Sequence, residues 1–228
     1  MRLAAPIALV MANCLVVSSG CGSSATQDQT GDAPSVSEPT VATTSPIAAP
    51  AVAVALTESD LHPRVHLRTN RGDVTIELDM RAAPRTVTNF LSYVQSGHYD
   101  QTLFHQVEVG YVVVGGSYTP DLKERAVRYP IVSEADNGLK NTRGTIAMAR
   151  STDDPNSATC QFFINLSDNP SLDHRGSTPA EFGYCVFGRV IEGLDALDRI
   201  SGLPVKSDER FLKMPVETVM IERADTVR

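Results

Sequence analysis

Residues 104–116 read Phe-His-Gln-Val-Glu-Val-Gly-Tyr-Val-Val-Val-Gly-Gly and give the clearest indication of the fold. Two short apolar runs, Leu103–Phe104 at its start and Tyr111–Val114 within it, are separated by a glycine, which is typical of neighbouring β-strands. Further short apolar runs, again separated by Gly and Pro, lie at Thr145–Ala149, Phe162–Leu166 and Tyr184–Val190. The pattern predicts a sheet of many short strands.

Upstream of this stretch, residues 66–78 are predicted to form a β-hairpin with its turn at Asn70–Asp73. A helix is expected to begin at Pro84, and a second, shorter helix is expected near the C-terminus. The apolar residues at helical spacing are Val87, Phe90, Leu91 and Val94 in the first, and Leu194, Leu197 and Ile200 in the second. Two helices among many short strands favour a mainly β fold, a closed antiparallel barrel rather than a doubly wound sheet.

Residues 1–21 are predicted to be an export signal. Arg2 is followed by the apolar run Leu3–Val17, which is too short to span a bilayer comfortably, and then by small residues. The ending at Gly20–Cys21 resembles the bacterial lipobox, in which the cysteine is lipidated and becomes the mature N-terminus, although Ser18 stands where leucine is usual. The alternative is a plain signal peptide cleaved nearby, with Cys21 unmodified.

The rest of the chain divides by composition. Residues 22–61 are rich in Ser, Thr, Ala and Pro and are predicted to be a disordered tether. Residues 62–228 are predicted to form the folded domain. An exported protein with a lipidated Cys21 would be anchored to a membrane, facing the periplasm or the cell exterior.

The composition narrows the range of partners. The chain has 228 residues, 42% of them apolar, so it can bury a core, and its net charge of −7 comes with no basic stripe. A nucleic-acid partner is therefore not expected. The five histidines show no metal-ligand spacing, so neither a metal nor a cofactor is expected, and a monomer is predicted.

Cys160 and Cys185 could form a disulfide in an oxidising compartment, but two buried thiols are the preferred interpretation.

The order of the motifs resembles the cyclophilin family over nearly all of residues 62–224. Residues 104–116 are similar to the family segment Phe-His-Arg-x-x-x-Gly-Phe-x-x-Gln-Gly-Gly, and residues 134–150, 154–165 and 184–188 follow in the family's order and spacing. The resemblance implies a closed eight-stranded antiparallel β-barrel capped by two helices. It also implies peptidyl-prolyl cis–trans isomerase activity on proline-containing segments, without a cofactor.

The resemblance also implies a set of site residues. The positions expected to take part in catalysis are Gln106, His105 and Tyr111. The positions expected to bind substrate are Val112, Val114, Ala149, Arg150, Gln161, Phe163, Leu172 and Tyr184. Taken without the resemblance, the apolar members of this set are more simply barrel core, and His105 is more simply a structural histidine.

The sequence departs from the family at two linked positions. Gln106 replaces the family's catalytic arginine, and Val114 replaces the glutamine that helps to hold it. Glutamine keeps a donor but loses the charge, and charge-assisted hydrogen bonds contribute about 1.5–3 kcal/mol against about 0.5–1.5 kcal/mol for neutral ones. Two functions follow: an isomerase that assists the folding of exported proteins with weakened activity, or a barrel that binds proline-containing segments or a protein partner with little turnover.

Overall fold

The computed structural model describes residues 57–207 and 209–227. The predicted signal, Cys21 and most of the predicted tether lie outside these residues. Within them, no helix combines the length and the apolar character needed to cross a membrane.

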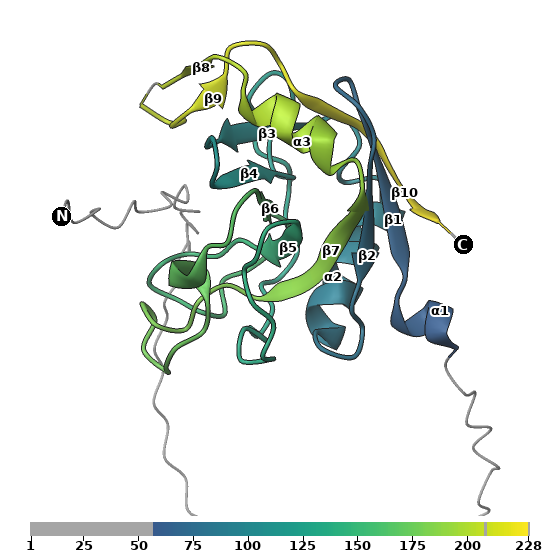
Figure 1. The fold of residues 1–228 in the computed structure, drawn as a ribbon, viewed down its shortest axis with the longest axis vertical. Helices are drawn as coiled ribbons and strands as arrows, with labels where there is room; N and C mark the ends of the chain where they lie inside the picture. The colour runs from purple at the N-terminus through teal and green to yellow at the C-terminus, as the bar shows by residue number, and fades with distance from the viewer. Residues whose placement is uncertain (1–56, 208, 228) are drawn as a thin grey trace, which may run out of the picture. The chain divides into compact units, whose positions relative to one another are not determined.

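Eight strands close into an antiparallel barrel in the order β1-β10-β3-β4-β6-β5-β7-β2 (Figure 1). The strands are β1 (Arg64–Thr69), β2 (Val74–Leu78), β3 (Thr102–Val107), β4 (Val112–Gly115), β5 (Thr145–Met148), β6 (Phe162–Asn165), β7 (Val186–Glu192) and β10 (Met220–Val227). The closed eight-stranded barrel predicted from the sequence is confirmed.

Both predicted helices are present, as α2 (Pro84–Gln95) and α3 (Leu194–Ser201). The sequence pattern did not predict strand β10. The structure also adds four short elements: α1 (Glu58–Leu61), the 3-10 turn η1 (Pro170–Leu172), and a separate two-stranded sheet of β8 (Val205–Lys206) and β9 (Met214–Pro215). These pieces are one turn or two residues long, which is too short for a hydrophobic period to develop.

The barrel is filled from strands and helices together. Helix α2 buries Phe90, whose ring lies 5.6 Å from Phe162 and 5.2 Å from Phe187, measured between ring centroids. Because successive strand residues point to opposite faces, Val113, Ile146 and Ile164 join this core while their neighbours face outward. Cys160 and Cys185 are free buried thiols, and burial raises the pKa of each to about 11.

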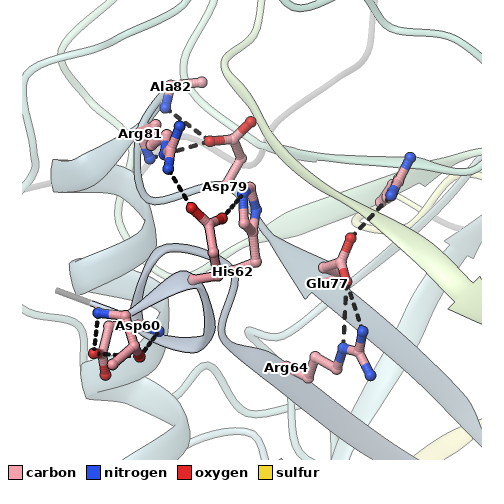
Figure 2. Close-up of polar contacts among 10 residues, drawn as sticks. Asp60, His62, Arg64, Glu77, Asp79, Arg81 and Ala82 are labelled. Atoms are coloured by element: carbon pink, nitrogen blue, oxygen red, sulfur yellow. Dashed lines mark hydrogen bonds and ion pairs between the residues drawn. The ribbon is translucent and has the colours of Figure 1, made fainter.

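The folded domain begins earlier than the expected boundary at residue 62. Thr57 and Asp60 form a capping box at the start of α1, and the backbone carbonyl of Leu61 accepts a hydrogen bond from Met80 N at 2.9 Å. Arg81 reaches back to Glu58 with Nη2 2.7 Å from Oε1 (Figure 2). The last residues of the segment expected to be a tether are therefore bonded to the barrel, because their polar groups cap a helix and find partners after β2.

Candidate active site on the outer face of the barrel

Four neighbouring barrel strands carry a second apolar cluster that is separate from the main core. Its buried members are Val112, Val114, Ala147, Ala149, Phe163, Leu172, Tyr184 and Val186, with Tyr111 and Leu139 partly buried against them. These residues alternate along β4, β5 and β6 with residues of the main core, so they occupy the opposite, outer face of the sheet. We call this set the outer apolar cluster. It brings together six of the eleven predicted site positions, with Tyr111 at its edge.

Gln106 is aligned with this cluster by an irregularity in β3. Phe104 pairs with Gly115, and Gln106, two residues later, pairs with Val114, the neighbour of Gly115. His105 is therefore an extra, unpaired residue in β3, as in a β-bulge. Val114 in turn pairs with Phe163. Directly opposed residues share a face and have Cβ atoms about 4.5–5.5 Å apart, so Gln106, Val114 and Phe163 form one row. The row places a hydrogen-bonding amide at the end of an apolar surface.

The amide of Gln106 belongs to a three-residue polar network. Its Nε2 donates to Glu108 Oε1 at 2.9 Å, and Lys213 Nζ lies 2.6 Å from the other carboxylate oxygen, Oε2. The Glu108 side chain is only 5% exposed, whereas the Lys213 side chain is 42% exposed. Sequence reasoning missed both charged residues. Glu108 interrupts an apolar run two positions after Gln106, which was a usable signal, but Lys213 is 105 residues further along the chain and gave none.

His105 is buried among aromatic residues beside the barrel. Its ring packs against Tyr118 and Phe211, with centroids 4.8 and 6.1 Å away, as part of the irregular step in β3. Burial lowers the pKa of His105 from 6.5 to about 4, so the imidazole is neutral at physiological pH. Its contacts fit the structural role that the sequence left open, and we assign it no proton transfer.

The segment that carries Leu172 is fastened to the barrel by buried amides. Asn141 Nδ2 donates to the Leu172 carbonyl at 3.1 Å, and Asn165 Nδ2 donates to Asn141 Oδ1 at 3.2 Å. Asn169 Nδ2 donates to Asn165 Oδ1 at 2.7 Å. All three asparagines are buried, so their polar groups hold the loop in one position. The sequence gave no signal for this network, because the three residues are scattered among loop-forming polar residues.

Arg150 was expected to line the groove with its backbone, and its side chain bonds to the neighbouring loop. Its guanidinium donates to the backbone carbonyls of Gly183, Ser151 and Pro179 at 2.7–2.8 Å and lies 5.0 Å from the centroid of the Tyr184 ring. The Tyr184 ring meets Phe163 edge-on at 5.5 Å. Arg150 therefore supports the rim tyrosine through its side chain and is already bonded to the loop, so it does not stand in for the missing arginine.

The remaining predicted positions border the cluster. Ala149 N donates to the Gln161 carbonyl at 2.9 Å, which extends the pairing of β5 with β6, and the Gln161 side chain is partly exposed. Burial raises the pKa of Tyr111 and of Tyr184, so both hydroxyls stay protonated at physiological pH. Among residues 57–207 and 209–227 there is no cluster of His, Cys, Asp and Glu side chains that could hold a metal ion.

The site places the Gln106 amide beside an apolar cluster that is buried except at its edge, where Tyr111 and Leu139 are partly exposed. Rotation about an X–Pro bond meets a barrier of about 18–20 kcal/mol because the amide is resonance-stabilised. A donor near the prolyl nitrogen localises its lone pair, which weakens the partial double bond without covalent chemistry. The geometry therefore suits conformational catalysis on a proline-containing chain.

Comparison with known proteins agrees with this geometry. The family model described as cyclophilin type peptidyl-prolyl cis-trans isomerase/CLD matches residues 64–225. The peptidyl-prolyl cis-trans isomerase cyp18 of Streptomyces antibioticus is 50% identical over 160 residues, which are 70% of this chain and 96% of that protein. The peptidyl-prolyl cis-trans isomerase B of Escherichia coli is 46% identical over 158 residues, 69% of this chain and 96% of that protein.

A solved structure is similar as well. The cyclophilin type isomerase of Cryptosporidium parvum, crystallised in the presence of the dipeptide Ala-Pro, has a TM-score of 0.60 and 28% identity, and the match covers 71% of this chain and 96% of that one. The barrel and its outer site define a peptidyl-prolyl cis–trans isomerase that acts on proline-containing peptides. This chain belongs to the cyclophilin family.

Proposed function

We propose that this chain is an exported, lipid-anchored cyclophilin that isomerises X–Pro bonds in proteins outside the cytoplasm. Its rate is reduced because a neutral amide replaces the family's arginine. One observation carries the weakened rate: the neutral amide of Gln106 stands in the row with Val114 and Phe163, at the position where the family has an arginine. The apolar part of the family site is retained around it.

The reduction has a calculable size. Replacing a charged donor by a neutral one loses about 1–2 kcal/mol of transition-state stabilisation, which is about 5- to 30-fold in rate. The Val114 side chain cannot hydrogen-bond to the Gln106 side chain, so the orientation of the Gln106 amide depends on Glu108. The slow isomerase is the preferred function.

A binding module with little turnover is the second candidate. It is favoured by the engagement of the only amide in the row, which leaves Gln106 one N–H at most for a substrate. The two candidates share the apolar surface and differ only in whether the bound X–Pro bond rotates faster.

Titration with the dipeptide Ala-Pro, followed by NMR, tests the location of the site. The resonances of Phe163, Leu172 and Tyr184 are expected to shift, while those of Tyr129, which is 94% exposed and outside the cluster, stay unchanged. A protease-coupled prolyl-peptide assay on the same sample separates the candidates. A rate above the uncatalysed one supports the isomerase, and binding without acceleration supports the module.

Export and anchoring rest on the apolar run that ends at Cys21. Mass spectrometry of the membrane-extracted protein is expected to find a diacylglyceryl group on Cys21, and Cys21→Ala is expected to release the protein from membranes. A soluble protein cleaved at another bond would refute the anchor without touching the isomerase activity.

A further inference from the structure

Glu108 is a carboxylate almost removed from water beside the row of site residues. A buried charge is costly unless a counter-charge and hydrogen bonds compensate it. Two groups do so here: the Gln106 amide at 2.9 Å and the Lys213 ammonium at 2.6 Å, one on each carboxylate oxygen. The lysine is the only cation that the described part of the chain brings to this carboxylate.

The backbone of Lys213 has a conformation that favours glycine. Its φ is +52°, in the left-handed region that side chains disfavour. The Lys213 carbonyl accepts from Val107 N and its N–H donates to Ser207 Oγ, both at 3.0 Å, so the backbone bonds β3 to the segment before β9. Glycine would satisfy this backbone at least as well, so what the lysine adds is its ammonium group.

We infer that Lys213 is a positioning residue of the isomerase: its ammonium holds the Glu108 carboxylate at Oε2, and Glu108 thereby fixes the Gln106 amide for the substrate. The inference rests on the proposed function. A carboxylate can only accept hydrogen bonds, so the nitrogen end of the amide must face it. Without the ammonium, the Glu108 carboxylate loses the partner that holds Oε2, so neither its orientation nor that of the Gln106 amide bonded to Oε1 stays fixed.

The competing interpretation is an ion pair that only stabilises the fold. The two differ in what they predict for catalysis. Positioning predicts that the rate follows the charge at residue 213, whereas a structural pair predicts that the melting temperature changes and the rate does not. Lys213→Gly separates the effects further, since it relieves the positive φ while removing the ammonium.

The test uses the full chain with Lys213→Met, Lys213→Gly and Lys213→Arg. Lys123→Met is the matched control, because Lys123 forms an ion pair of the same length, 2.6 Å, with Asp121 on the surface. Steady-state kcat and KM are measured on a prolyl peptide. The side-chain ¹⁵N–¹H amide signals of Gln106 are recorded in parallel, so that its orientation is followed without reference to activity.

Lys213→Met and Lys213→Gly are expected to lower kcat about two- to twelvefold, the rate equivalent of one neutral hydrogen bond, with KM unchanged. The Gln106 amide signals move in both, and Lys213→Arg restores the rate and the signals. Unchanged kcat in Lys213→Met and Lys213→Gly, or unmoved Gln106 signals, would overturn the inference. An inactive wild type would refute the proposed function instead, and the Gln106 signals would still decide whether Lys213 orients the amide.

Discussion

The side-chain nitrogen of Gln106 lies 2.9 Å from Oε1 of Glu108, so the residue at the family's arginine position is tied to a buried carboxylate two residues along the chain. This contact changes what a restored arginine would do. Arginine and carboxylate form bidentate pairs that hold the guanidinium in place. A guanidinium at this position would meet Glu108 before it met a substrate.

Gln106→Arg alone is therefore expected to raise kcat/KM by less than about fivefold. Combining it with Glu108→Gln removes the competing carboxylate and is expected to yield the full gain of about 5- to 30-fold. Because the two side chains share a hydrogen bond, their effects on the activation free energy are non-additive. A prolyl-peptide assay of both single variants and the double variant measures this coupling. Strict additivity would contradict the competition.

The buried asparagines are expected to control how firmly Leu172 is held. Asn141→Ala removes the donor to the Leu172 carbonyl and the acceptor for Asn165. Leaving such groups unsatisfied costs about 1–3 kcal/mol. The urea-unfolding free energy is expected to fall by that amount and KM to rise, with Tyr129→Ala as a neutral surface control. An unchanged KM would mean that this loop is not part of the substrate surface.

Most of the fold was predictable because seven of the eight barrel strands and both long helices carry an apolar pattern of their own, whereas β10 does not. The outer apolar cluster was reached only through the resemblance, since Val112 and Phe163 are as buried as core residues and read as core. The contacts of His105 and Lys213 could not be predicted from the sequence for a different reason. They depend on an irregular strand step and on a contact between segments about a hundred residues apart, and neither leaves a local pattern.

Acid is expected to destabilise the domain partly through His105. Its folded pKa is about 4 against 6.5 for the free side chain, because burial disfavours the charged form. As the pH falls below 6.5 the unfolded chain takes up a proton that the folded chain refuses, so stability is lost between pH 6.5 and 4, by about 3 kcal/mol in total.

His105→Phe keeps a ring against Tyr118 and Phe211 and removes the titration. Chemical denaturation of both proteins between pH 7 and 4 measures the difference. The wild type is expected to lose more stability than the variant over this interval. An equal loss of stability in both proteins between pH 7 and 4 would mean that His105 takes up its proton in the folded state as readily as in the unfolded chain.

The start of the domain can be located by truncation. A chain beginning at Thr57 keeps α1, whereas a chain beginning at Arg64 loses α1 and the carbonyls of Leu61 and Pro63 that accept from Met80 and Leu78. The chain beginning at Thr57 is expected to have the same melting temperature as the full chain. The shorter form is expected to be about 1–2 kcal/mol less stable, a drop of roughly 3–6 °C in Tm. Equal melting temperatures would return the boundary to residue 62 or beyond.

On the proposed function, this barrel accelerates X–Pro rotation through the amide of Gln106 beside the outer apolar cluster. The most direct measurement is kcat/KM for a prolyl peptide with wild type and Gln106→Leu, which keeps the volume and removes the donor. The wild type is expected to exceed the uncatalysed rate, and Gln106→Leu to be about tenfold slower with its Tm within a few degrees of the wild type. A Gln106→Leu variant as fast as the wild type would show that the Gln106 amide takes no part in catalysis.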